Sequence, residues 1–175
     1  MKFIHPTADV STKAIIGNKT KIWHQSQIRE DVIIGEDCII GKNVYIDFGV
    51  IIGDKVKIQN NCSIYHGAVI ESGAFIGPHV VLTNDKYPRS INKKGQLKES
   101  KDWKVGKIKI CIGASIGAGC IVLPDVTIGK YAMIGCGSVV TKDIPDYSLA
   151  YGNPAKCKGK VSKEGKQLFN TGTDC

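Results

Sequence analysis

The feature that most constrains the fold of this chain is an aliphatic residue that recurs at every sixth position. The series reads Val10, Ile16, Ile22, Ile28, Ile34, Ile40, Ile46, Ile52, Ile58, Ile64, Ile70, Ile76 and Leu82. Ile, Val and Leu account for 44 of the 175 residues, so thirteen in succession arise by chance with a probability on the order of 10⁻⁸. Neither the period of an α-helix nor that of a flat strand explains a repeat of six.

A second series, two residues before the first, holds small or β-branched side chains. It reads Ala8, Ala14, Thr20, Ser26, Val32, Cys38, Val44, Val50, Val56, Cys62, Ala68, Ala74 and Val80. Residues two apart point to the same side of a strand, so both series face one interior. Glycine often follows the large aliphatic residue, at Gly17, Gly35, Gly41, Gly53 and Gly77. We expect glycine or asparagine to relieve backbone strain where the chain turns. Stacked coils of this kind build one continuous aliphatic core.

The repeat is interrupted once, over residues 83–109. It resumes as Ile110, Ile116, Val122, Ile128, Ile134 and Val140, with Ala114, Cys120, Val126, Ala132 and Ser138 as the small series. The interval from Leu82 to Ile110 is not a multiple of six, so the chain re-enters the repeat in a new phase. We predict a coiled domain over residues 1–145 with a loop excursion at 83–109, and a C-terminal tail over 146–175 that packs on the coil. Long excursions tend to be functional.

The net charge of +8 concerns partners rather than fold. Residues 83–107 hold eight Lys or Arg residues against three acidic ones, a net charge of +5. A polyphosphate ligand or nucleic acid would suit such a segment. Aromatic residues do not alternate with the basic ones as a stacking platform for bases requires. We therefore expect no nucleic acid partner.

The remaining composition points to an intracellular chain. No segment approaches about 18 uninterrupted apolar residues, so we expect no membrane span, and the N-terminus lacks the apolar run of a secretory signal. The seven cysteines are odd in number and show no CxxC spacing, which indicates reduced thiols: Cys38, Cys62, Cys111, Cys120, Cys136, Cys157 and Cys175. We expect a cytoplasmic location.

The repeat resembles the left-handed parallel β-helix of the hexapeptide-repeat family over roughly residues 8–82 and 108–142. The resemblance implies an all-β solenoid in which three hexads form one coil. It also implies a homotrimer with acyl-CoA sites between neighbouring subunits. Carbonic anhydrase members of this fold carry two histidines five residues apart, and no pair among His5, His24, His66 and His79 has that spacing. We expect no metal site.

A coil of three hexads predicts which polar residues stack. Asn84, His66, Phe48 and Glu30 follow one another at intervals of three hexads, and the neighbouring row is Thr83, Tyr65, Asp47 and Arg29. Tyr65, His66, Thr83, Asn84 and Asp85 should therefore gather beside the excursion. His66 can equally be a plain surface residue of a turn.

The segment from Gly77 to Ser90 is the most specific local motif. With residues 57–61, Tyr65-His66-Gly67 and the stretches 113–118, 137–145 and 152–156, it resembles the sugar-nucleotide N-acetyltransferases. These enzymes acetylate the 3-amino group of UDP- or dTDP-linked sugars destined for surface polysaccharides, of the UDP-2-acetamido-3-amino-2,3-dideoxyglucuronate and dTDP-3-amino-3,6-dideoxyhexose types. The resemblance implies acetyl-CoA as co-substrate and a nucleotide sugar as acceptor.

We assign candidate roles within this interpretation. The Asn84 side-chain oxygen can orient the amine toward the thioester, and His66 is the candidate general base, although the departing thiolate can take the proton itself. Candidate substrate contacts are Tyr65, Asp85, Lys86, Tyr87, Arg89 and Asn60. Candidate acetyl-CoA contacts are Ala114, Ser115, Ala118 and Gly119, whose small size lets the pantetheine chain lie close, and Lys142 and Lys156 near its phosphates.

Two other functions remain open at this point. An O-acetyltransferase of the same fold would depend strictly on a base such as His66. A non-catalytic assembly protein would use the basic excursion to bind phosphate groups, and its DNA binding would fall steeply with salt.

Overall fold

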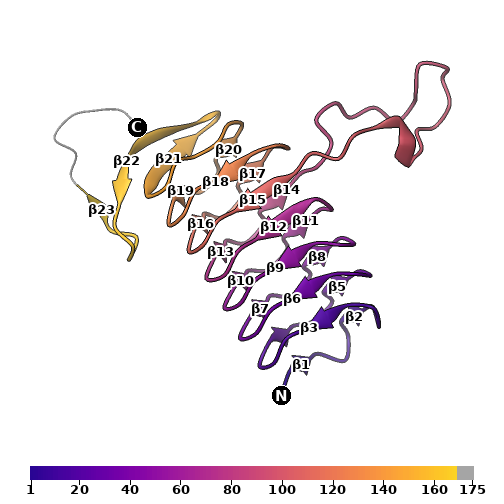
Figure 1. The fold of residues 1–175 in the computed structure, drawn as a ribbon, viewed down its shortest axis with the longest axis horizontal. Helices are drawn as coiled ribbons and strands as arrows, with labels where there is room; N and C mark the ends of the chain where they lie inside the picture. Colours follow the sequence, from indigo (N-terminus) through magenta and orange to yellow (C-terminus); the bar gives the residue numbers. More distant parts are fainter. Residues whose placement is uncertain (169–175) are drawn as a thin grey trace.

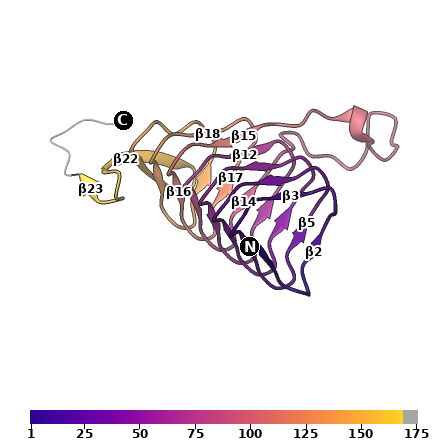
Figure 2. The same cartoon turned by 60° about the horizontal axis from the view of Figure 1, so that its bottom comes forward.

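The computed structural model describes residues 1–168 and shows a parallel β-solenoid, in the form of a left-handed β-helix (Figure 1). Every coil contributes one short strand to each of three sheets, so the cross-section is triangular, as the tilted view shows (Figure 2). The fold predicted from the hexad repeat is confirmed. One short 3₁₀ helix, η1 (Ser100–Asp102), lies in the excursion.

Three sheets form the faces. The ten-stranded sheet comprises β1 (Phe3–Ile4), β4 (Lys21–Ile22), β7 (Ile39–Ile40), β10 (Lys57–Ile58), β13 (Phe75–Ile76), β16 (Ser115–Ile116), β19 (Met133–Ile134), β21 (Ser148–Gly152), β22 (Ala155–Val161) and β23 (Gln167–Leu168). The seven-stranded sheet comprises β2 (Asp9–Val10), β5 (Gln27–Ile28), β8 (Tyr45–Ile46), β11 (Ser63–Ile64), β14 (Val81–Leu82), β17 (Ile121–Val122) and β20 (Val139–Val140). The six-stranded sheet comprises β3 (Ile15–Ile16), β6 (Ile33–Ile34), β9 (Ile51–Ile52), β12 (Ala68–Ile70), β15 (Ile108–Ile110) and β18 (Thr127–Ile128).

The core is the aliphatic column that the repeat predicts. Tyr45 and Ile46 of β8 pair with Ser63 and Ile64 of β11, which is a register of three hexads. From Ile22 to Leu82 every large member of the column is at most 1% exposed. Each such side chain contributes roughly 1.5–3 kcal/mol before the entropy of ordering is counted. The column therefore sets both the period and the stability of the solenoid.

Three cysteines belong to the small series of the column. Cys38, Cys62 and Cys120 are buried, and each thiol donates to the carbonyl of a glycine, at 3.1, 3.0 and 3.1 Å respectively. Burial raises the pKa of all three thiols. These cysteines act as small core groups, as expected. Cys175 lies outside the described residues.

The glycines that follow large aliphatic residues have a different structural role from the one predicted. They do not adopt a positive φ; the left-handed residue comes two positions later, at residues such as Asn43 and Lys55. A Cβ on Gly53 would lie 2.7 Å from the backbone nitrogen of Ser72 in the next coil. A Cβ on Gly77 would lie 2.7 Å from the nitrogen of Ala118. The predicted strain relief was wrong for glycine, because close approach between coils is what requires it, but it is confirmed for asparagine at Asn43 and Asn61.

The excursion is shorter than predicted at its C-terminal end and preserves the order of the faces. β15 begins at Ile108, which is buried and pairs with Ala68 of β12. The extra residues are inserted where the chain passes from the seven-stranded to the six-stranded sheet, so the coil resumes on the next face. Residues 83–107, called the arm below, project from the body of the solenoid (Figure 1).

The chain after residue 145 continues the ten-stranded sheet. β21 pairs in parallel with β19, and β22 and β23 follow as antiparallel strands. The peptide bond between Asn153 and Pro154 in the turn between β21 and β22 is cis. Within residues 1–168, no helix has the length and apolar character needed to cross a membrane.

Candidate functional site

The predicted polar row lies on the corner between the seven-stranded and six-stranded sheets, which we call the loop corner (residues 29–32, 47–50, 65–67, 83–107, 123–126 and 141–143). The Asn84 side chain donates from Nδ2 to the His66 carbonyl oxygen at 3.2 Å. His66 Nδ1 lies 2.8 Å from the Phe48 carbonyl oxygen. The His66 and Phe48 rings stack at 3.9 Å between centroids. Residues three hexads apart are therefore direct neighbours, as the coil length predicted.

These contacts determine which atoms remain available to a ligand. A carbonyl oxygen accepts only, so His66 Nδ1 carries the proton and Nε2 keeps the lone pair in the neutral ring. The Asn84 amide nitrogen is engaged with a carbonyl in the same way, which leaves its Oδ1 as an acceptor. The loop corner thus presents two hydrogen-bond acceptors, on half-buried side chains, beside the root of the arm.

A buried carboxylate lies one coil below His66. Asp47 is 7% exposed, and its Oδ1 accepts from the Tyr45 hydroxyl at 2.9 Å, Phe48 N–H at 2.9 Å and Arg29 Nη1 at 3.0 Å. Its Oδ2 accepts from His66 N–H at 3.2 Å. Burial alone would raise the pKa of this carboxyl, but the four donors together lower it below its usual value. The sequence row contained Asp47, yet nothing in its spacing marked it as the acceptor for four donors.

Arg29 balances the Asp47 charge. Its guanidinium pairs with both Asp47 and Glu30 and lies 5.3 Å from the centre of the Phe48 ring. Arg29, Phe48 and His66 therefore form one stacked column along the loop corner. The column fixes the ring of His66 from below.

The root of the arm is tied to the coil by backbone contacts. Gly106 N–H donates to the Asn84 carbonyl at 2.8 Å, and Lys107 N–H donates to Asp125 Oδ1 at 3.1 Å. Gly67 has a φ of +92°, and a Cβ there would lie 2.8 Å from the Gly106 carbonyl oxygen. Glycine after His66 is thus needed for both the turn and the close approach of the arm.

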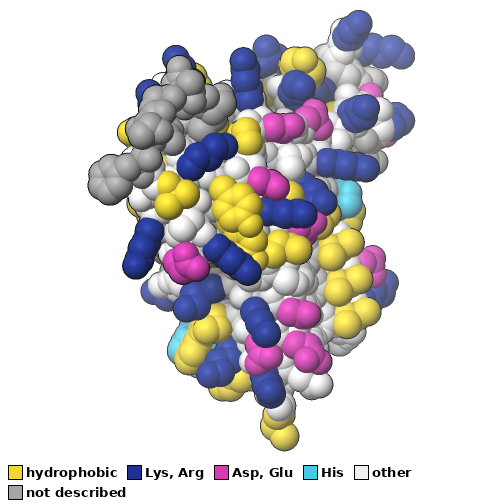
Figure 3. Space-filling view, turned by 60° about the vertical axis from the view of Figure 1, so that its left-hand side comes forward, with side chains coloured by type: hydrophobic (Ala, Val, Ile, Leu, Met, Phe, Trp, Pro, Cys, Tyr) yellow, Lys and Arg dark blue, Asp and Glu magenta, His cyan; other side chains and the backbone are white. Residues whose placement is uncertain are grey.

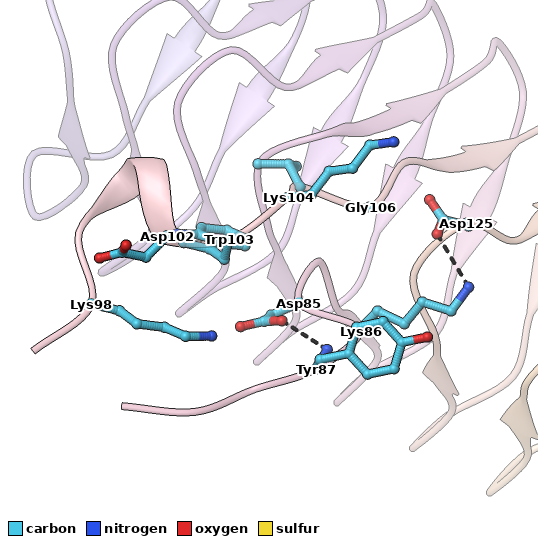
Figure 4. A pocket seen from close by; sticks show the side chains of 10 residues that line it. Asp85, Lys86, Tyr87, Lys98, Asp102, Trp103, Lys104, Gly106 and Asp125 are labelled. Carbon is cyan, nitrogen blue, oxygen red and sulfur yellow. Dashed lines mark hydrogen bonds and ion pairs between the residues drawn. The ribbon is translucent and has the colours of Figure 1, made fainter. Parts of the chain in front are cut away.

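A cavity of about 300 Å³ lies at the root of the arm (Figure 4). Its lining includes Asp85, Lys86 and Tyr87 from the outgoing segment and Lys98 and Trp103 from the returning one. Lys86 Nζ lies 3.5 Å from Asp125 Oδ2, and Asp85 Oδ1 accepts from Tyr87 N–H at 2.9 Å. In Figure 4 the Lys98 side chain extends toward Asp85. The cavity offers aromatic rings and ammonium groups to one ligand.

The structure brings some predicted substrate contacts together and separates others. Tyr65 lies on the loop corner, with its ring 5.7 Å from that of Tyr45. Arg89 is exposed farther out on the arm and donates to the Pro88 carbonyl. Asn60 lies on the corner between the ten-stranded and seven-stranded sheets, where it accepts from Lys42 N–H at 2.9 Å. Asn60 is therefore on a different corner from Asn84, and its side chain joins two coils.

The predicted acetyl-CoA contacts are also dispersed. Ala114 is fully buried in the small series, so its side chain is a core group. A role for Ala114 at the acetyl-CoA site stays a prediction that rests on its backbone and small size. Ser115 lies in β16 on the outer face, and Ala118 and Gly119 lie on the same corner as Asn60. Lys142 follows β20 at the loop corner, and Lys156 is exposed in β22. One ligand would have to span two corners of a single chain to meet them all.

Sequence signals for the missed residues were weak. Trp103, one of two tryptophans, lies in a basic segment without periodicity, so only the folded arm shows that it faces the cavity. Among residues 1–168 no group of three or more His, Cys, Asp or Glu side chains is arranged to hold a metal ion.

A parallel solenoid of hexads defines the fold class of this chain, and comparison with protein families gives the family. The family described as bacterial transferase hexapeptide (six repeats) matches residues 13–47, 49–84 and 107–142, which is more than half of the chain. The hexapeptide repeat of succinyl-transferase matches residues 31–66. The chain belongs to the bacterial hexapeptide transferase family.

Curated relatives match parts of the chain. A dTDP-3-amino-3,6-dideoxy-alpha-D-galactopyranose 3-N-acetyltransferase of Aneurinibacillus thermoaerophilus is 59% identical over 56 residues, 32% of this chain and 29% of the relative. A galactoside O-acetyltransferase of Lactococcus lactis is 38% identical over 98 residues, 55% of this chain and 44% of the relative. The chain thus matches less than half the length of either relative.

Solved structures match nearly the whole chain. A mutant of the GDP-perosamine N-acetyltransferase from Caulobacter crescentus, in complex with CoA and GDP-perosamine, has a TM-score of 0.57 and 26% identity. The match covers 91% of this chain and 57% of that one. The acetyltransferase domain of PglB from Neisseria gonorrhoeae, with acetyl coenzyme A, has a TM-score of 0.56 and 24% identity over 90% of this chain and 57% of that one. The second likeness shows the fold alone.

Proposed function

We propose that the protein is an acetyl-CoA-dependent N-acetyltransferase that acylates the 3-amino group of a UDP- or dTDP-linked amino sugar. The observation that carries the proposal is the pair of acceptors at the loop corner, Asn84 Oδ1 and His66 Nε2. A primary amine has N–H groups that need acceptors, and two acceptors on one corner can both orient it and remove a proton. The named relatives that act on amino sugars support the same substrate class.

The reaction requires positioning rather than a covalent intermediate. The neutral amine nitrogen attacks the thioester carbonyl carbon, the C–N bond forms and the C–S bond breaks. Asn84 accepts one N–H and aims the lone pair, and the second proton passes to His66 Nε2 or to the departing CoA thiolate. The products are the N-acetyl sugar nucleotide and CoA.

The arm supplies binding energy for the nucleotide. Its ammonium groups outnumber its carboxylates, so it attracts a diphosphate, and Lys86 and Arg89 are the proposed phosphate contacts. Tyr65 and Tyr87 offer rings for the base or sugar, and Asp85 offers an acceptor for a sugar hydroxyl. Lys142 lies two coils beyond Asn84 at the loop corner, within the segment proposed for a CoA phosphate, with Lys156 as its second contact.

We propose a homotrimer in the cytoplasm, acting in surface polysaccharide synthesis such as that of lipopolysaccharide. The dispersion of the candidate acetyl-CoA contacts supports an oligomer, because Ser115, Ala118 and Gly119 lie on a different part of the coil from Lys142, and the resemblance to the family favours the trimer. Two copies can bring both sets to one ligand where one copy cannot. Sedimentation velocity should give three times the chain mass, and a monomer that turns over substrate would refute the trimer.

An O-acetyltransferase is the second candidate, because the galactoside O-acetyltransferase matches a larger share of this chain than the 3-N-acetyltransferase does. A hydroxyl is a far weaker nucleophile than an amine at neutral pH, so this reaction depends fully on a base. His66→Ala would abolish O-acetyl transfer but leave partial N-acetyl transfer.

A thiol-release assay with acetyl-CoA tests the proposal. Acceptors are UDP-, dTDP- and GDP-linked amino sugars and a galactoside, with Asn84→Ala and His66→Ala alongside the wild type. We expect CoA release with one nucleotide-linked amino sugar, and at least a hundredfold loss in Asn84→Ala. Release with the galactoside alone would favour the second candidate, and release with none would remove the N-acetyltransferase proposal.

A further inference from the structure

Asp47 connects two coils at the point where the candidate catalytic side chains lie. Its Oδ1 accepts three hydrogen bonds, two from its own coil and one from Arg29 of the preceding coil. Its Oδ2 accepts from the His66 N–H of the following coil at 3.2 Å. The carbonyl of the same residue, His66, accepts from Asn84 Nδ2 at 3.2 Å. The backbone of His66 is therefore held from below by Asp47 and bonded from above to Asn84.

The chemistry of the carboxylate makes this arrangement specific. An ionised carboxylate is acceptor-only and can receive donors at both oxygens. An amide of the same shape has one accepting oxygen and one donating nitrogen. An asparagine at position 47 would accept the three donors now bonded to Asp47 Oδ1 with its side-chain oxygen. Its NH₂ group would then face the His66 N–H. A donor would then oppose a donor, and the turn that carries His66 would have to move.

The four donors to Asp47, with the Arg29 charge among them, favour its ionised form although the side chain is buried. Its side chain is buried, Arg29 pairs with it at 3.0 Å, and its row continues upward through Tyr65 to Thr83 at the root of the arm. Other carboxylates on the coil also accept from a backbone N–H one coil away, as Asp54 does from Glu36 at 2.8 Å. Asp54, however, is exposed and lies on the corner between the six-stranded and ten-stranded sheets, away from the loop corner.

We infer that Asp47 is a positioning residue that sets the height of the His66 peptide and, through it, the direction of the Asn84 side chain. We call the two hydrogen bonds on the His66 backbone, to Asp47 and from Asn84, the clamp. The expected effect on kinetics rests on the proposed function, whereas the geometry of the clamp does not depend on it. Asn84 would remain the group that touches the substrate. Asp47 would act only through the His66 backbone.

Asp47→Asn tests the inference, with Asp54→Asn as the matched control. In the acetyl transfer assay we expect Asp47→Asn to lower kcat at least tenfold while the KM for acetyl-CoA stays within twofold. Asp54→Asn should leave both constants within twofold of the wild type. A fall in stability without this split between kcat and KM would overturn the positioning role.

A spectroscopic readout separates this inference from the proposed function. The Asn84 side-chain NH₂ signals, assigned with Asn84→Ala, should shift in Asp47→Asn and coincide with the wild type in Asp54→Asn. Unchanged signals in Asp47→Asn would refute the clamp, whatever the turnover. If the wild type transfers no acetyl group, the proposed function fails and these signals still decide the clamp. Should Asp47→Asn not fold, Asp47→Glu keeps the charge beside Arg29, displaces the carboxylate by one methylene and should produce the same shift.

Discussion

Individual residues in each turn of the solenoid meet two different steric demands. The first residue of the turn after β9, Gly53, lies against the backbone of the next coil, and the third, Lys55, adopts a φ of +56°. The first position has no room for a Cβ, whereas the third imposes a backbone conformation that costs an L-residue roughly 1–2 kcal/mol. A larger residue at position 53 should therefore destabilise the protein, whereas glycine at position 55 should not.

We expect Gly53→Ala to destabilise the protein by about 1–3 kcal/mol, because the coils must separate to admit the methyl group. Lys55→Gly should leave the free energy of unfolding unchanged or raise it by up to about 1 kcal/mol, since relief of strain offsets the entropy of glycine. Urea denaturation of both variants measures this. A Gly53→Ala variant as stable as the wild type would show that coil spacing does not require glycine there, and a loss of stability in Lys55→Gly would contradict the strain assigned to Lys55.

The His5 imidazole is a second residue whose environment sets a measurable property. Its Nδ1 accepts from Thr7 N–H at 3.2 Å and lies 2.9 Å from the Thr7 hydroxyl, which itself accepts from Gln25 N–H at 3.1 Å. The ring stacks on His24 at 3.4 Å between centroids. Partial burial and then the neighbouring His24 lower the pKa of His5.

Because the folded-state pKa of His5 is below the unfolded value of about 6.5, folding favours the neutral ring. This contribution to stability is present above pH 6.5 and is lost as the pH falls from there through the folded pKa. The melting temperature of the wild type should thus decline between pH 7.5 and 5 more than that of His5→Gln. Parallel declines in the two proteins would mean that His5 does not contribute.

At the scale of elements, the arm is an insertion that the solenoid tolerates. Asp85 and Val105 form an antiparallel bridge at its root, and β14 and β15 keep their places on consecutive faces. Figure 3 shows basic side chains clustered at the upper right, whereas basic and acidic side chains are interspersed over the rest of this face. The arm holds eight Lys or Arg residues against three acidic ones, so its net charge is positive.

Replacing residues 86–104 by Asn-Gly should preserve the fold, because two residues suffice to join antiparallel neighbours. A shorter loop costs less closure entropy, so we expect the unfolding free energy to stay the same or rise by up to about 2 kcal/mol. Acetyl transfer should fall at least a hundredfold. Circular dichroism and the thiol assay report the two effects, and a variant that is active at the wild-type rate would exclude the arm from the site.

At the scale of the whole molecule, stability should vary along the axis of the solenoid. Each coil contacts only its neighbours, so the order of a coil depends on having one on each side. The first coil has a neighbour on one side within the described chain, and Ile4, Val10 and Ile16 are only half-buried, whereas Ile22 and later members of the column are buried.

Amide hydrogen exchange should therefore be fastest in β1 to β3 and slowest in the middle coils. We expect the Asp9 amide, bonded to the Ser26 carbonyl, to exchange at least tenfold faster than the Tyr45 amide, bonded to the Cys62 carbonyl. Mass spectrometry of peptides or NMR resolves the two. Uniform protection along the axis would instead indicate a single cooperative unit.

The sequence determined the solenoid and much of the loop corner. A hexad repeat of Ile, Val and Leu admits one way of burying every sixth residue, and a coil of three hexads then makes His66 and Asn84 neighbours without further information. The local period predicts long-range contacts because every coil pairs with the previous one in the same register. For the same reason the sequence located the arm, as the segment where the period stops.

Only the tertiary structure decided the roles of residues that the period does not distinguish. Ala114 and Ala118 are both small, but one points into the core and the other lies on a corner away from Asn84, so composition could not separate them. The four donors that converge on Asp47 come from four residues and three coils, and Trp103 reaches its cavity through a segment without a repeat. Hydrogen-bond geometry and the path of an aperiodic loop depend on atoms that meet only after the coils have stacked.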